Sequence, residues 1–64
     1  MLKSNISYWK EKSGRSNKWI AKQLGVSEET VSRWINDKGM PSVVKLFNLA
    51  VLLECKVDDL YKQK

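Results

Sequence analysis

Apolar residues recur along this chain at the three- and four-residue spacings of short amphipathic helices, and serine and glycine separate the segments. Ser4 is the expected N-cap of a first helix, which stops at Gly14 because glycine commonly stands just past a helix end. Ser16 and Gly25 bracket a second helix in the same way. The pattern therefore predicts short helices divided by tight turns.

A third helix is expected to begin after Ser27, and its two faces differ in polarity. At about 100° per residue, Val31, Trp34 and Ile35 fall on one stripe that should face the core. The residues on or beside the opposite face are Glu28, Glu29, Ser32 and Arg33. This helix therefore combines a buried seam with an outer face of hydrogen-bonding side chains.

A fourth helix, capped by Ser42 and running to about Leu53, is apolar nearly all round. Its predicted core side holds Val43, Leu46, Phe47, Leu49, Ala50 and Leu53. Val44 and Val51 lie well off that side, and Leu52 lies opposite its centre. In one interpretation Val51 packs on the first helix and Leu52 is tolerated in solvent. In the other, this face and the turn after it form a homodimer interface of Val44, Val51, Leu52, Cys55 and Val57.

The rest of the chain adds one more helical segment and no other kind of element. Residues 36–39 read as a polar turn, and residues 57–61 as a turn or two of helix. We find no strand signal, internal repeat, low-complexity segment or linker. The expected fold is therefore all-α, a compact five-helix domain that spans residues 1–64, with a thin core because a 64-residue chain buries only about 60% of its unfolded surface.

Charge and composition favour a binding module over an enzyme. Twelve Lys and Arg against seven Asp and Glu give a net charge of +5, and residues 1–45 alone hold nine basic and four acidic side chains. Such a surplus favours a polyanionic partner. The chain has no histidine, the usual acid–base group at neutral pH and the commonest metal ligand. We therefore predict no enzymatic activity, no metal site and no cofactor.

A single cysteine and the absence of long apolar runs indicate where such a chain works. Cys55 alone cannot form an intramolecular disulfide, and no apolar run approaches the ~20 residues that span a bilayer. We expect a cytoplasmic protein with no membrane partner. Trp9, Trp34 and Phe47 stand at helical spacings and are expected in the core, as is Cys55, which should be buried and inert.

Residues 16–35 have the organisation of a helix-turn-helix, a helix followed by a short turn and a second helix of similar length. Gly25 suits the sharp turn between them, and the small Ala21 lets the two helices cross closely. In this arrangement the second helix can lie in the DNA major groove.

The sequence resembles the XRE-type family of helix-turn-helix regulators, which includes Cro and lambda repressor. The first matching block is Ile20, Ala21, Lys22, Gln23, Leu24, Gly25, Val26 and Ser27, then Thr30, Val31, Ser32, Arg33, Trp34 and Asn36. The second block is Pro41, Ser42, Leu46, Leu49, Ala50, Leu53, Val57, Asp58, Leu60 and Tyr61. Together the blocks cover roughly residues 6–61, and they imply the five-helix lambda-repressor-like fold.

The resemblance implies a sequence-specific regulator of double-stranded DNA, of the phage or mobile-element repressor type. It implies base contacts from the start of the third helix and one turn later, at Ser27, Glu28, Glu29, Ser32 and Arg33. It also implies phosphate contacts at Ser16, Asn17, Asn36 and Lys38, to which neighbouring Arg15 and Lys18 would add charge. A homodimer would place two such helices about 34 Å apart on a near-palindromic operator.

Some positions depart from the family pattern. Glu54 stands where a glycine commonly ends the fourth helix, which implies strain or a different helix end. Ile35 replaces a usual acidic residue and removes any ion pair with Lys10. The rival interpretation is a protein-interaction module of the same fold, an antitoxin-like or anti-repressor subunit. The paired glutamates and the extra apolar face favour that rival, whereas the basic surplus and Arg33 favour DNA.

Overall fold

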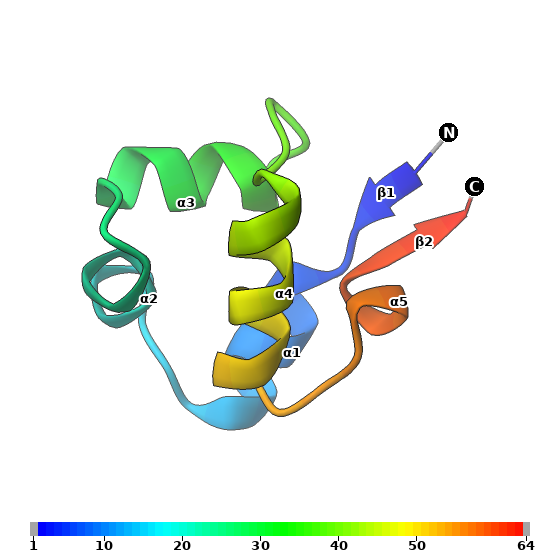
Figure 1. Ribbon diagram of the computed structural model, residues 1–64, viewed down its shortest axis with the longest axis horizontal. Helices are drawn as coiled ribbons and strands as arrows, with labels where there is room; N and C mark the ends of the chain where they lie inside the picture. The colour runs from blue at the N-terminus through cyan, green and yellow to red at the C-terminus, as the bar shows by residue number, and fades with distance from the viewer. Residues whose placement is uncertain (1, 64) are drawn as a thin grey trace.

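Five short helices and one two-stranded sheet make up the computed structural model, which describes residues 2–63 (Figure 1). The helices are α1 (Ile6–Ser13), α2 (Asn17–Leu24), α3 (Glu28–Ile35), α4 (Val43–Leu52) and α5 (Val57–Leu60). The strands are β1 (Leu2–Ser4) and β2 (Tyr61–Gln63). The radius of gyration is 10.3 Å, close to the ~11 Å expected for a folded domain of this length. The five-helix fold that the sequence predicts is therefore confirmed.

Serine hydroxyls begin three of the helices, as predicted. Ser16, Ser27 and Ser42 each accept a hydrogen bond from the backbone N–H three residues later, at 3.0, 3.1 and 3.3 Å respectively. The prediction for Ser4 is wrong. The N-cap of α1 is Asn5, which makes no side-chain capping bond, while Ser4 belongs to β1 and its hydroxyl accepts from the Ile6 N–H at 3.3 Å.

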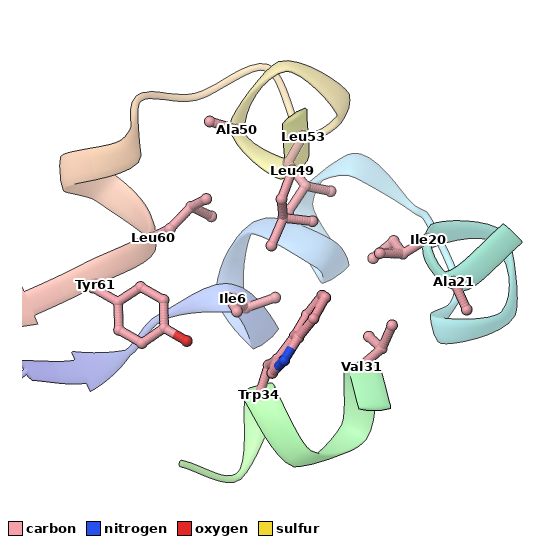
Figure 2. Packing of buried hydrophobic residues seen from close by; sticks show 10 residues of the cluster. All are labelled: Ile6, Ile20, Ala21, Val31, Trp34, Leu49, Ala50, Leu53, Leu60 and Tyr61. Atoms are coloured by element: carbon pink, nitrogen blue, oxygen red, sulfur yellow. The ribbon is translucent and has the colours of Figure 1, made fainter. Parts of the chain in front are cut away.

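Ten buried residues, nine from six of the seven elements and Leu53 directly after α4, form one core (Figure 2). They are Ile6, Ile20, Ala21, Val31, Trp34, Leu49, Ala50, Leu53, Leu60 and Tyr61. Figure 2 shows Ile20 and Ala21 of α2 facing Val31 of α3, with Leu49 of α4 and its C-cap residue Leu53 across the cluster. The predicted seam of α3 is confirmed at Val31 and Trp34, and Ile35 is half-buried against the same cluster.

The expectation of no strands is wrong. β1 and β2 pair antiparallel, with Leu2 opposite Gln63, Lys3 opposite Lys62 and Ser4 opposite Tyr61. Each strand is only three residues long, and the pairing joins segments almost a whole chain apart. Local periodicity carries no signal for such a pair, because three residues show no clear alternation and their partner lies far away in the sequence.

The core side of α4 is narrower than the sequence pattern predicts. Leu49 and Ala50 are buried and Leu46 is half-buried, but Val43 is 70% exposed and Phe47 58% exposed. The assignment of Phe47 to the core is therefore wrong. The packed seam of α4 follows an i, i+3, i+4, i+7 pattern that leaves Val43 and Phe47 on the solvent side.

Candidate nucleic-acid interface

The α2–α3 pair has the geometry of a helix-turn-helix. Gly25 lies in the left-handed region with φ 70°, and the Val26 N–H donates to the Ala21 carbonyl at 3.0 Å, which closes the end of α2. Ala21 is 3% exposed where the two helices cross. The turn and the small residue thus have the roles that the sequence predicts, and they set α3 along one edge of the molecule (Figure 1).

The outer face of α3 carries polar side chains that the fold leaves accessible. Glu28, Glu29 and Arg33 are exposed, and Ser32 is half-buried between that face and the core. Ser27 is exposed too, but its hydroxyl is occupied by the cap and by a 2.9 Å hydrogen bond with the Thr30 hydroxyl. The accessible groups of this face are therefore two carboxylates and one guanidinium, which donates a 3.4 Å hydrogen bond to the Lys38 carbonyl.

The start of α2 presents a second group of donors. The Arg15 guanidinium carbon lies 4.2 Å from the centroid of the Trp19 ring, in a cation–π contact that leaves the Arg15 charge at the surface. Lys18 and Ser16 are exposed, and Asn17 is half-buried. These residues surround the positive end of the α2 dipole, where backbone N–H groups favour an anion.

Lys10 of α1 supports this group through a contact with α2. Its Nζ donates to the Asn17 Oδ1 at 3.0 Å and so joins α1 to the first residue of α2. The bond uses the Asn17 oxygen and leaves the side-chain amide N–H groups free to donate. Helical spacing alone could not find this contact, because it crosses between two elements.

The turn after α3 contains the third group of predicted contacts. Asn36 and Lys38 are exposed, and the Asn36 amide donates to the Ser32 hydroxyl at 3.4 Å. The Lys38 N–H donates to the Arg33 carbonyl at 2.8 Å, and the Asp37 N–H donates to the Trp34 carbonyl at 3.3 Å. With Asp37 at φ 59°, this is a Schellman ending of α3.

The predicted base-contacting and phosphate-contacting residues come from three stretches of chain: the start of α2, the outer face of α3 and the turn after α3. Contact of any of them with DNA stays a prediction.

The resemblance to a known family, in contrast, is testable by direct comparison. The family model described as Helix-turn-helix matches residues 6–60. The chain belongs to the XRE-type helix-turn-helix family.

Solved structures agree with this assignment. The crystal structure of a candidate DNA-binding protein from Bacteroides fragilis is similar to this XRE-type protein, with a TM-score of 0.90 and 35% sequence identity. The match covers 97% of this chain and 100% of that chain. Among curated protein sequences, none matches. Membership of the family supports a DNA-binding regulator of the XRE type.

Away from α2 and α3, this XRE-type protein exposes an apolar stripe along α4. Val43 and Val44 are each 70% exposed, Phe47 is 58% exposed and Val51 75% exposed. The interpretation that Val51 packs on α1 is therefore wrong. Leu52, which was expected opposite the core side, is half-buried.

The stripe continues into an open groove between α4 and α5. The groove has a volume of about 460 Å³ and is lined by Phe47, Ala50, Val51, Cys55, Lys56, Val57 and Asp58. Cys55 and Val57 are half-buried, so the prediction of a buried Cys55 is wrong. Partial burial, and then the charge of Asp59, raise the pKa of the Cys55 thiol, which keeps it neutral and weakly nucleophilic.

Within residues 2–63, no three His, Cys, Asp or Glu side chains gather closely enough to hold a metal ion. None of the helices in the same described residues has the length and apolar character needed to cross a bilayer.

Proposed function

We propose that this protein is a sequence-specific regulator of transcription that binds double-stranded DNA, a repressor of the phage or mobile-element type. The observation that supports this most is the accessible outer face of α3, where Glu28, Glu29 and Arg33 stand clear of the core. In XRE-type proteins the helix in this position can enter the major groove.

The chemistry of α3 suits base reading. The Arg33 guanidinium can fork onto guanine O6 and N7, a contact that discriminates by about 1–3 kcal/mol. Glu28 or Glu29 can accept from cytosine N4, the complementary base of such a pair. The same carboxylates repel phosphates, so they favour a docking in which α3 lies deep in the groove and not against the backbone.

Phosphate contacts on either side of α3 would hold it in register. The candidates at the start of α2 are Arg15, Ser16, Asn17 and Lys18, and those after α3 are Asn36 and Lys38. These groups carry no base information, but they set the orientation of the protein on the duplex. Contacts from Lys and Arg also make the affinity depend steeply on salt.

A homodimer would explain the exposed apolar stripe of α4. Val44, Phe47 and Val51 form a ridge beside the groove that contains Cys55 and Val57. A ridge next to a groove is suited to a two-fold interface, since each copy can place its ridge in the groove of the other. Leu52 is half-buried and would lie at the edge of this contact. Such a dimer would present two α3 helices to a near-palindromic operator.

The same stripe also supports a second candidate, a protein-interaction module that acts through a different protein. In that case the ridge and groove would hold the partner, and the glutamates of α3 would remain in solvent or contact that partner. The two candidates differ in their response to salt, because only binding to phosphates releases condensed counterions in proportion to the contacts made.

Selection of bound sequences from a random pool of DNA duplexes tests the proposal directly. We expect enrichment of a near-palindromic site whose half-sites are about 10 base pairs apart. The affinity for that site should fall with salt by a slope of about −0.9 per neutralised phosphate. Recovery of no enriched sequence, together with salt-insensitive association with protein, would reject DNA reading in favour of the second candidate.

A further inference from the structure

A hydrogen bond joins the turn after α3 to β1 of the strand pair. The Asp37 Oδ1 accepts a hydrogen bond of 2.8 Å from the backbone N–H of Ser4, which lies 33 residues earlier in the chain. Figure 1 places β1 beside the loop that joins α3 to α4. Since Asp37 is also the left-handed residue of the Schellman ending, one residue both closes α3 and binds β1.

Strand geometry makes Ser4 available for this contact. The Asn5 N–H donates to the Leu60 carbonyl at 2.8 Å, so Asn5 and Leu60 continue the ladder of β1 and β2. Neighbouring residues of a strand direct their N–H groups to opposite sides. The Ser4 N–H therefore points away from β2, at the free edge of β1, and meets the Asp37 carboxylate there.

Tyr61 lies next to the Ser4–Asp37 hydrogen bond, as the β2 partner of Ser4. It is 7% exposed and stands opposite Ser4 in the ladder, and its hydroxyl finds no hydrogen-bond partner among the described residues. Figure 2 shows the ring with its hydroxyl directed toward the part of the core that holds Ile6 and Trp34. Burial first, and the negative charge of Asp37 second, raise the pKa of Tyr61.

We infer that the strand pair positions the phosphate-contacting turn through the Ser4–Asp37 hydrogen bond, with Asp37 as the positioning residue. This rests on the proposed function, because the turn holds Asn36 and Lys38. The Lys38 N–H and carbonyl bond only to Arg33, at 2.8 and 3.4 Å, among the described residues. Among residues 2–63, the Ser4–Asp37 bond is thus the hydrogen bond that ties this turn to a part of the fold other than α3.

The coupling runs in both directions. If the strand pair raises DNA affinity by ordering the turn, then DNA binding stabilises the strand pair by the same factor.

Asp37 itself bears a negative charge close to the expected phosphates, so the Asp37 carboxylate opposes DNA binding electrostatically. The hydrogen bond from Ser4 requires a side-chain oxygen at this position, which glycine, the usual residue of a left-handed turn, would not supply.

The test compares Asp37→Asn with Asp37→Gly. Both variants remove the charge and both tolerate φ 59°, but only asparagine keeps an oxygen acceptor for the Ser4 N–H. We expect Asp37→Gly to bind the selected duplex about fivefold more weakly than Asp37→Asn, because ordering one residue at the moment of binding costs at least that factor. Its salt slope should be smaller by about 0.9, the loss of one phosphate contact. The ranking of base sequences should not change.

Glu54→Gly is the matched control. Glu54 is the other acidic residue in the left-handed region, with φ 55°, and it ends α4 in the same way without a bond to β1. This control shows how glycine and the loss of one negative charge act by themselves. We expect it to bind DNA at least as tightly as the wild-type protein.

Ser4→Pro and Ser4→Ala give an independent pair that leaves every charge in place. Proline lacks the N–H that donates to Asp37, and at the free edge it removes no ladder hydrogen bond. Alanine removes only the hydroxyl. We expect Ser4→Pro to resemble Asp37→Gly, and Ser4→Ala to resemble the wild-type protein.

Hydrogen exchange of the Lys38 amide without DNA separates this inference from the proposed function. We expect exchange about fivefold faster in Asp37→Gly and Ser4→Pro than in their matched partners, by the same ordering argument. Equal exchange rates within both pairs would overturn the inference, whatever the DNA result. Faster exchange with equal DNA affinity and equal salt slope would overturn it as well. Failure of the wild-type protein to bind any duplex would instead reject the proposed function, and with it the phosphate-positioning role.

Discussion

Arg33 and Lys38 bond to each other twice across the end of α3. The Lys38 N–H donates to the Arg33 carbonyl at 2.8 Å, and the Arg33 Nη2 donates to the Lys38 carbonyl at 3.4 Å. The second bond is long and exposed, so the guanidinium can leave it for a better acceptor. The candidate base reader and the candidate phosphate contact are thus neighbours in space, and one turn positions both.

Substitution of these two residues should separate base reading from backbone contact. Arg33→Ala is expected to lose about 1–3 kcal/mol at the preferred base and to flatten the ranking of DNA sequences. Lys38→Ala should weaken binding to all sequences alike and reduce the salt slope by about 0.9. Competition binding with single-base variants of the selected site, at several salt concentrations, measures both effects. An unchanged ranking in Arg33→Ala would contradict its base-reading role.

The two left-handed helix ends at Gly25 and Glu54 predict stability changes of opposite sign. A Cβ at Gly25 would meet nothing within 4 Å, so Gly25→Ala should destabilise the protein through backbone conformation alone, by about 1–2 kcal/mol. Glu54→Gly removes that same strain at φ 55° and should stabilise by about 1 kcal/mol. Urea unfolding measures both variants. A destabilised Glu54→Gly would show that the glutamate side chain has a compensating contact.

Tyr61 should make the protein less stable at alkaline pH. Its pKa is raised above the ordinary value of 10.0, first by burial and second by Asp37, so the fold favours the neutral phenol. That contribution is complete below pH 10.0 and is lost as the pH rises through the raised pKa. Tyr61→Phe should therefore lessen the alkaline decline in the free energy of unfolding.

Tyr61→Phe should also stabilise the protein at neutral pH by about 1 kcal/mol, because the buried hydroxyl has no partner among residues 2–63. Thermal unfolding between neutral pH and pH 11 compares it with Tyr8→Phe, a control at a side chain that is 54% exposed. Equal pH profiles in the wild-type protein and Tyr61→Phe would refute the assignment.

The homodimer proposal predicts that one charge on the α4 ridge abolishes association. Val51 is 75% exposed, so Val51→Glu should leave the fold intact but bury a carboxylate at the proposed interface. Analytical ultracentrifugation at tens of micromolar should give the mass of one chain for this variant and of two chains for the wild-type protein. Tyr8→Glu adds the same charge on α1 as a control. A single-chain mass for the wild-type protein, with and without DNA, would remove the dimer.

Features that depend on neighbouring residues were predictable from the sequence. A serine hydroxyl caps the N–H three residues ahead, and this explains the correct prediction of helix starts at Ser16, Ser27 and Ser42. The outer face of α3 was predictable for a similar reason, since helical periodicity alone places Glu29 and Arg33 opposite the core seam. Glu54 in place of glycine predicted either strain or a different helix end, and its φ of 55° shows the first of these.

Features that depend on distant residues were not predictable from the sequence. Phe47 has the spacing of a core residue, but whether a seam is buried depends on what packs against it, and there α5 leaves an open groove. Asp37 reads as an ordinary turn residue until β1 lies beside it. The roles of the candidate DNA contacts remain predictions, because they depend on a partner that the chain does not contain.

The sequence by itself determined the five helices, the serine caps of α2, α3 and α4, the helix-turn-helix and the polar face of α3, because each follows from interactions within one or two helical turns. The tertiary structure alone decided that β1 pairs with β2, that Ser4 binds Asp37 and that Phe47 and Val51 stand in solvent. These contacts join residues with no periodic relation in the sequence, and only the packed core brings them together.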